Sequence, residues 1–404
     1  MLLTLTKQLW LKMRRDPVLL VLLLAAACYF FLYYATDPSR PGGIFPTIFG
    51  RRDSTLYNLG WYGFYDQGQY LREAHTLASL RFHELYQTYT YGIGYPLVAV
   101  PAIWLGFNKD PFVFFNFLAF IFAIYAVYKV AYKLISPMAG MLAGFGLLFA
   151  TPLLHYTDQP WNSTVCLVAM SVVLLTLTVK KVTKWHALLI GFVVGWAFAA
   201  RYIDVIFLGA LGLMSMYRSG SLKTLFKPVI YMAVGCAIFA IPVFFSQYKI
   251  FGSPFRTPYV NHLGIGGVDG SDQGLKAYNI KRVPESALAI FVSPRLAGSH
   301  DVDRGILIDF FCALAAIPGL VILIRKKNHT LFLYTLLAVS IAASLFYLSF
   351  RASNSGALKY GTLHYFKMFW PCLVLLAVGF FDHIFVQGQR KIESTSVRTR
   401  KAKA

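Results

Sequence analysis

The sequence predicts an all-α polytopic membrane protein with about ten or eleven transmembrane helices. Of its 404 residues, 57% are hydrophobic and only 14% are charged. Many apolar runs approach the length of about 20 residues that an α-helix needs to cross a bilayer. Lys and Arg, which bring the formal net charge to +21, gather in short segments between these runs and at both ends of the chain. Membrane topology therefore accounts for the positive charge, and we expect no nucleic-acid partner.

Ten apolar segments are predicted to cross the membrane. The first, residues 18–34, follows several basic residues but lacks a convincing small-residue cleavage site. We therefore interpret it as a retained span rather than as a signal peptide. The other predicted spans are residues 111–128, 138–151, 163–179, 186–199, 205–217, 228–247, 305–324, 330–349 and 366–386.

The basic segments predict how these spans are oriented. Lys and Arg cluster at residues 129–133, 180–184, 218–227 and 325–327, and again from residue 390 onward. All five clusters lie on the cytoplasmic side only if residues 93–107, which Pro96 and Pro101 interrupt, dip into the membrane or lie flat. We therefore expect an integral multi-pass protein of the plasma (inner) membrane with both termini in the cytoplasm. The loops that hold the candidate site residues then face the extracytoplasmic side.

A single transmembrane domain is predicted for residues 1–387. It contains a large first outer loop, residues 35–95, and a later outer loop, residues 248–303. Residues 388–404 form a basic Ser/Thr/Lys/Arg tail, which we expect to be disordered in the cytoplasm and close to anionic membrane lipid.

Asp66, in the first outer loop, is the candidate catalytic carboxylate. The apolar residues that follow it recur at helical spacing, at Tyr70, Leu71, Ala74, Leu77 and Ala78, while Gln69, Arg72, Glu73 and His75 fall elsewhere. This pattern predicts an amphipathic helix that lies along a membrane surface rather than crossing it. Asp66 is then expected at the boundary between water and lipid.

Two alternatives to a catalytic Asp66 remain open. The run Asp-Gln-Gly-Gln has the form of a helix N-cap, which satisfies free N–H groups without any chemistry. The two roles are compatible, because the helix dipole favours a charged carboxylate at a helix start. Asp53 is the rival carboxylate, but it follows Arg51 and Arg52, which are expected to neutralise it.

Arg201 is the best placed candidate cation. It lies in the stretch FAARYID between two short apolar runs, where an unpaired charge within lipid would be expensive. The alternative is a structural ion pair or turn with Asp204, three residues further on.

Four further residues are candidates from outer loops. Lys359 and Arg256 are possible anion ligands, although loop Lys and Arg are most often simply solvated. His155 and Asp158, in TPLLHYTDQPWNS, are suited to bind a metal or a substrate, but a His and an Asp at this spacing are also ordinary turn residues.

These motifs resemble those of the GT-C superfamily of integral-membrane glycosyltransferases, which includes protein O-mannosyltransferases and the lipid A aminoarabinose transferase. The similar stretches are Asp66-Gln67-Gly68-Gln69-Tyr70-Leu71, YGIGYPLVAVPAIWLG, Thr151-Pro152-Leu153, Gly191 and Gly195 leading to Arg201, FGSPFRTPY, and Lys359-Tyr360. Two features depart from the family pattern. The first loop has a single Asp where some relatives place two adjacent acids, and Lys359 stands where an Arg is frequent.

The resemblance implies a GT-C type fold, in which the first extracytoplasmic loop carries juxtamembrane helices. It also implies transfer of a sugar from a polyprenyl-phosphate donor to a lipid, glycan or protein acceptor on the outer face. Asp66 is then the catalytic base, Arg201, Lys359 and Arg256 bind the donor phosphate, and His155 and Asp158 contact substrate or a metal. A divalent cation such as Mg²⁺ or Mn²⁺ stays open as a cofactor, since nothing in the sequence requires one.

Two other functions share part of this pattern. A transporter or flippase for a lipid-linked sugar would place ionisable residues inside the spans, along a pathway. The predicted spans hold almost none, and the acidic residues lie in outer loops. A polysaccharide polymerase or ligase shares the many spans and a large outer loop, but the Asp66 motif in the first loop favours the transferase.

Overall fold

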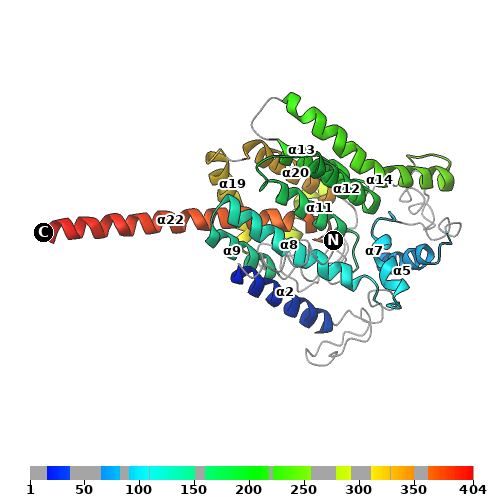
Figure 1. The fold of residues 1–404 in the computed structure, drawn as a ribbon, viewed down its shortest axis with the longest axis horizontal. Coiled ribbons are helices and arrows are strands. Elements are labelled where there is room, and N and C mark those ends of the chain that lie inside the picture. Colours follow the sequence, from blue (N-terminus) through cyan, green and yellow to red (C-terminus); the bar gives the residue numbers. More distant parts are fainter. Residues whose placement is uncertain are drawn as a thin grey trace.

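The computed structural model describes residues 16–36, 65–81, 91–108, 110–150, 160–217, 222–255, 279–292, 311–327, 329–349 and 363–403. These residues form helices and turns, with no strand among them (Figure 1). The main helices are α2 (Pro17–Thr36), α5 (Tyr65–Ala78), α7 (Pro96–Trp104), α8 (Val113–Leu134), α9 (Pro137–Leu148), α11 (Ser163–Thr176), α12 (Lys184–Ala200), α13 (Asp204–Met216), α14 (Phe226–Phe251), α19 (Ala316–Arg325), α20 (Thr330–Leu348) and α22 (Trp370–Lys403). The predicted all-α fold is confirmed.

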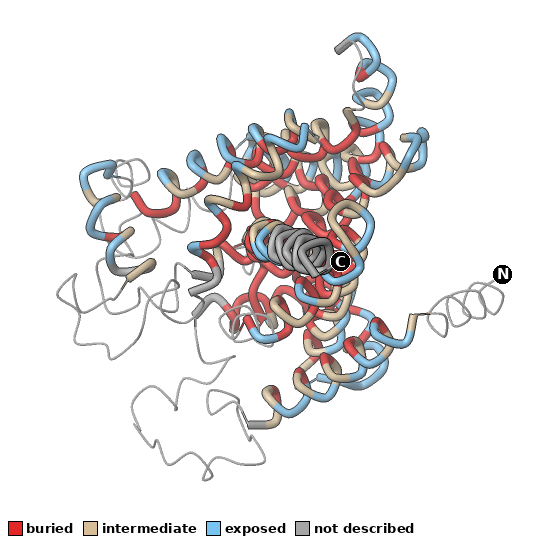
Figure 2. The backbone as a smooth tube through the Cα atoms, turned by 90° about the vertical axis from the view of Figure 1, so that its left-hand side faces the viewer, coloured by how far each residue is buried: buried red, intermediate tan, exposed pale blue. Residues whose placement is uncertain are grey.

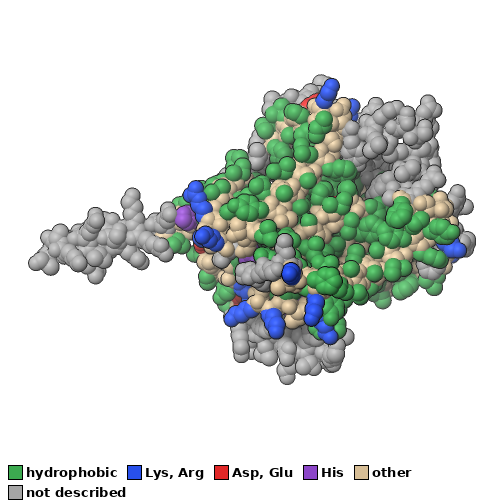
Figure 3. Space-filling model, turned by 90° about the horizontal axis from the view of Figure 1, so that it is seen from above, with side chains coloured by type: hydrophobic (Ala, Val, Ile, Leu, Met, Phe, Trp, Pro, Cys, Tyr) green, Lys and Arg blue, Asp and Glu red, His purple; other side chains and the backbone are tan. Residues whose placement is uncertain are grey.

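The apolar helices coincide with the predicted spans. Within the described residues, α2, α8, α14, α20 and α22 are long and apolar enough to cross a membrane. Five others, α9, α11, α12, α13 and α19, are apolar but shorter. Hydrophobic side chains cover most of the described surface that Figure 3 shows, as expected of a bundle whose sides face lipid.

Successive spanning helices run in opposite directions, so the connections between them fall at two ends of the bundle. Helices α5 and α7 lie at one end, which we call the α7 end, and α22 extends from the other (Figure 1). The turns α8–α9, α11–α12, α13–α14 and α19–α20 share the end from which α22 extends. They carry Lys133, Lys181, Lys223 and Lys326, so we call it the basic end. The basic clusters thus lie together, as the predicted orientation requires.

Helix α7 does not cross the bundle. Its nine residues span about 14 Å, against about 30 Å for the hydrocarbon core of a bilayer. Tyr95, before α7, stacks on Phe112, just before α8, with ring centroids 4.7 Å apart. At the other end of α7, the indole N–H of Trp104 donates a 2.8 Å hydrogen bond to the carbonyl oxygen of Ala78 at the end of α5. The start of α7 is therefore held against the start of α8, and its end is held against the end of α5.

Helices α12 and α14 approach closely through glycines. A Cβ atom built on Gly191 would lie 2.0 Å from the carbonyl oxygen of Met232, and one built on Gly195 would lie 2.6 Å from that of Cys236. Small residues allow such close backbone contact between membrane helices. The buried residues concentrate between the central helices, and α14 exposes much of its apolar surface (Figure 2).

The C-terminal segment differs from the expectation. Residues 388–403 were expected to be disordered, but the structure continues α22 as a helix through Lys403, well beyond the bundle (Figure 1). The segment contains Gln, Arg, Lys and Glu, which have high helix propensity, and it contains no proline. A helix that begins in a membrane span therefore continues past it without a stop signal.

Asp16, just before α2, connects the start of this helix to the last part of α8 at the basic end. Its Oδ2 atom lies 2.9 Å from Nζ of Lys129, and its Oδ1 atom accepts a 2.8 Å hydrogen bond from the hydroxyl of Tyr128. Burial acts to raise the pKa of Asp16, but the hydrogen bonds from Lys129 and Tyr128 outweigh burial and hold the pKa below its ordinary value.

We expect Asp16→Asn to lower the melting temperature at pH 7 and to have little effect in acid. A lowered folded-state pKa means that the ionised carboxylate stabilises the fold above the unfolded-state pKa of about 3.9. This contribution is lost as the pH falls through the folded-state pKa. Because the pair is partly exposed, the loss at pH 7 should stay within about 1 kcal/mol. Thermal unfolding of both proteins across this pH range checks the prediction, and a difference that persists in acid would contradict it.

Candidate active site

The structure describes some of the predicted site residues. Arg201 is described fully, and Asp66 is described as the second residue of α5 although its side chain is not. The other candidates, Lys359, Arg256, His155 and Asp158, lie outside the described residues, as does the rival Asp53. The candidate site is therefore built from Arg201 and from the elements that hold α5.

Arg201 forms a buried ion pair with Asp204. Arg201 ends α12 with an extended backbone, and Asp204 begins α13. Atom Nη1 of Arg201 lies 3.2 Å from Oδ2 of Asp204, and the two residues are only 4% and 0% exposed. The ion pair with Asp204, which is the structural alternative to a phosphate-binding role for Arg201, is therefore present. Despite this ion pair, Nη1 has no hydrogen-bond partner among the described residues. The guanidinium therefore retains donor capacity.

Helices α11 and α20 and the 3₁₀ turn Leu363–Phe369 supply further contacts to this ion pair. The thiol of Cys166 on α11 donates a 3.1 Å hydrogen bond to Oδ2 of Asp204, and the hydroxyl of Tyr347 on α20 donates to Oδ1. The guanidinium carbon of Arg201 lies 5.2 Å from the ring centroid of Tyr347 and 4.6 Å from that of Tyr365. Burial acts to lower the pKa of Arg201, but the Asp204 carboxylate raises it above its ordinary value. Arg201 is therefore a charged, aromatic-flanked cation.

Lys367 is a second buried cation at the α7 end, and sequence reasoning missed it. It is 1% exposed, in the 3₁₀ turn Leu363–Phe369, and its Nζ atom donates a 2.9 Å hydrogen bond to Oγ1 of Thr164. A signal was available, because Lys367 stands in the apolar run YFKMFW, where a charge is expensive in lipid. The same criterion selected Arg201.

Helix α5 is docked more deeply than its sequence pattern predicts. Tyr70, Ala74 and Leu77 are buried as expected. Gln69 and Glu73, expected on the polar side, are also buried, at 7% and 0% exposure. The expectation that Gln69 and Glu73 fall on the polar side of the helix is therefore wrong, because this face of α5 packs against protein.

Contacts between α5 and residues 91–95 explain this burial. Oε1 of Glu73 accepts a 3.2 Å hydrogen bond from the backbone N–H of Tyr91. The ring of Tyr70 packs on the rings of Tyr91 and Tyr95, with centroids 5.2 and 5.3 Å apart. Seven residues, about two helical turns, separate Asp66 from Glu73, so Asp66 holds the same register position as the docked face.

Residues 91–95 are in turn attached to the end of α12, next to Arg201. The N–H of Gly94 donates a 2.9 Å hydrogen bond to the carbonyl oxygen of Ala199, and the indole N–H of Trp196 donates a 2.7 Å hydrogen bond to the carbonyl oxygen of Gly94. A Cβ atom on Gly92 would lie 2.2 Å from the Ala199 oxygen. The segment YGIGYP thus links the helix of Asp66 to the corner of Arg201 by backbone contact that only glycine permits.

We expect Gly94→Ala to loosen α5. The new Cβ atom would meet backbone atoms at 2.6–2.9 Å, and such overpacking costs about 1–3 kcal/mol. The melting temperature should fall, and hydrogen exchange of the α5 amides should become faster. Gly209→Ala is the matched control, because nothing lies within 4 Å of its Cβ position and alanine favours the helix. Unchanged exchange in α5 of the Gly94 variant would contradict this link.

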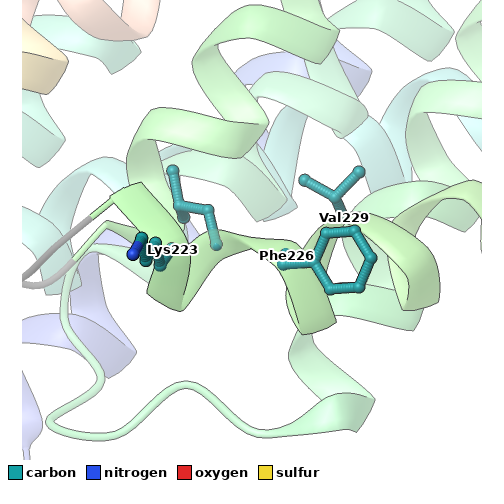
Figure 4. Close-up of a pocket in the computed structure, with 4 residues that line it drawn as sticks. Lys223, Phe226 and Val229 are labelled. Atoms are coloured by element: carbon teal, nitrogen blue, oxygen red, sulfur yellow. The ribbon is translucent and has the colours of Figure 1, made fainter.

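The described residues offer no clear alternative site. Within the described residues, no group of three His, Cys, Asp or Glu side chains is placed to hold a metal ion. A hollow formed by Lys223, Leu225, Phe226 and Val229 lies at the start of α14, at the basic end (Figure 4). Its lining is one lysine and three apolar residues, and none of the four is a carboxylate, histidine or cysteine.

Solved structures that share this fold include two of an archaeal oligosaccharyltransferase. No family model and no curated protein matches the chain. The oligosaccharyltransferase AglB from Archaeoglobus fulgidus, in complex with an inhibitory peptide and a dolichol-phosphate, superimposes with a TM-score of 0.53 at 14% identity, over 95% of this chain and 52% of that one. The A. fulgidus oligosaccharyltransferase in the apo form gives a TM-score of 0.52 at 13% identity, over 93% and 52%. The chain thus spans about half the length of these structures.

The fold that this chain shares with the A. fulgidus oligosaccharyltransferase confirms the predicted fold of the GT-C type.

Proposed function

We propose that this protein transfers a sugar from a polyprenyl-phosphate carrier to an acceptor on the extracytoplasmic face of the membrane. One observation carries the proposal: the helix that contains Asp66 is held, through residues 91–95, against the corner that contains the buried cation Arg201. The fold supports the same reading, since a neighbour with this fold was solved with a dolichol-phosphate.

The proposed chemistry divides between the two linked elements. An acceptor hydroxyl that attacks an anomeric carbon needs a base, and Asp66 supplies the carboxylate. The departing polyprenyl phosphate gains negative charge, which oriented donors and cations stabilise. Arg201 fits this role because it is charged and Nη1 retains donor capacity. Lys359 and Arg256 are proposed as further phosphate ligands, and His155 and Asp158 as ligands of the acceptor or of a divalent cation.

The acceptor belongs to one of three classes: a lipid, a glycan or a protein. The neighbour structure holds a peptide, which supports a protein acceptor in general terms. This chain corresponds to about half of that neighbour.

Flippase activity is the main competing function. A flippase needs polar groups along a path through the bundle. The described ionisable contacts instead gather at the two ends: Asp16 with Lys129 at the basic end, and Arg201 with Asp204 at the α7 end. This separation favours a transferase with a site at one end.

A donor panel tests the proposal. Purified protein is incubated with polyprenyl-phosphate sugars that differ in the sugar, and release of the free carrier phosphate is measured with and without candidate acceptors. We expect acceptor-dependent release for at least one donor. Proteoliposomes that move lipid-linked sugar between leaflets, with no carrier released from any donor, would instead establish the flippase.

Thiol labelling tests the proposed orientation. In a cysteine-free background, single cysteines at positions 66, 262 and 359 should react with an impermeant maleimide from outside intact cells. Cysteines at positions 181 and 326, which are exposed at the basic end, should react only after permeabilisation. Labelling of position 181 from outside would overturn the assignment.

A further inference from the structure

An apolar cavity lies at the basic end of the bundle, opposite the proposed catalytic site. It is enclosed by α8, α11, α19, α20 and α22, and its walls include Leu134, Leu174, Leu333, Leu336 and Leu375. Its volume of about 70 Å³ is several times the roughly 10–15 Å³ that one water molecule needs. A cavity with such walls does not hold water well, because water needs polar partners. Its natural occupant is therefore apolar.

The lining of this cavity also includes two basic residues. Lys326 and His329 line it, and Lys326 is exposed. Arg325 and Lys327, both exposed, flank Lys326 in the turn between α19 and α20. Lys327 and His329 adopt left-handed backbone conformations, with φ of 56° and 52°, which are costly for residues other than glycine. The turn thus keeps a strained shape that places cations beside an apolar opening.

We propose that this cavity binds the end of one acyl chain of an anionic phospholipid, whose phosphate lies on Lys326 and its basic neighbours. The cavity volume of about 70 Å³ is small, so the cavity suits the end of a single hydrocarbon chain rather than a larger ring system. In a membrane, the molecule that combines such a chain with a negative charge at the level of a basic turn is an anionic phospholipid. The site lies at the opposite end from Arg201 and does not depend on the proposed transfer reaction.

Native mass spectrometry of the full chain tests this proposal. Purified protein in detergent is mixed with dioleoyl phosphatidylglycerol or dioleoyl phosphatidylcholine, which carry the same chains and differ in headgroup charge. We expect the anionic lipid to bind preferentially. Lys326→Gln should reduce this preference about fivefold, the factor that corresponds to about 1 kcal/mol for one basic residue near an anionic surface. Leu333→Trp, which fills the cavity, should reduce binding of both lipids.

Lys181→Gln is the matched control, because Lys181 is exposed at the same end but does not line the cavity. The preference should survive in this variant. Equal losses in the Lys326 and Lys181 variants would show that the charge acts diffusely, and full lipid binding by Leu333→Trp would show that the chain lies elsewhere. Either result overturns the proposal. Lys326 is at the surface, so its variant remains informative if Leu333→Trp fails to fold.

Discussion

Asp66→Asn should slow sugar transfer at least ~100-fold, the lower end of general-base contributions, while the protein extracts and melts like the parent. Asp66 is the second residue of α5, in the first helical turn. An amide keeps the size of the carboxylate and much of its ability to hydrogen-bond free N–H groups there, so the helix should persist. An amide does not take a proton, so the base is lost. Transfer rates with a saturating donor, together with thermal unfolding, measure the two effects separately.

Two controls separate the base from its neighbours. Asp53→Asn should retain most activity, since Asp53 follows two arginines. Glu73→Gln removes the other carboxylate of α5 but keeps an oxygen that accepts from the N–H of Tyr91, so its activity should stay near normal. Near-normal transfer by Asp66→Asn, with loss in Asp53→Asn, would move the catalytic base upstream.

Arg201→Ala should weaken donor use and also destabilise the protein. Removal of the guanidinium leaves the Asp204 carboxylate buried without its cation, and breaking a buried pair costs about 3–5 kcal/mol. Arg201→Lys keeps the charge but loses the planar two-pronged geometry, so it should be impaired less. The measurements are the KM for the donor and the melting temperature.

A paired substitution separates the two consequences. Arg201→Leu combined with Asp204→Asn removes both charges, so much of the stability should return, because no unpaired charge stays buried. If Arg201 binds the donor phosphate, transfer by this variant should remain low. Recovery of donor use together with stability would show that the ion pair is only structural.

Local chemistry explains which parts of the fold were predictable. The lengths and hydropathy of the apolar segments determine where helices cross a bilayer, and the basic residues determine which turns share a side. Both properties depend only on residues that lie close together in the sequence. The spans, the grouping of the basic turns and the helix after Asp66 were therefore predictable without a structure. The exception is α22, where composition suggested disorder although helix propensity and an uninterrupted helical run favoured continuation.

Tertiary structure alone decided the contents of the candidate site. The three-residue spacing made the Arg201–Asp204 pair foreseeable, but the contacts from Cys166 and Tyr347 join positions 38 and 143 residues away from Asp204. Periodicity assigned Glu73 to a polar face, and docking on residues 91–95 buried it instead. The sequence by itself determined the membrane helices and the candidate carboxylate Asp66, because these follow from local pattern. Which side chains meet across helices depends on packing between distant segments, which no local pattern encodes.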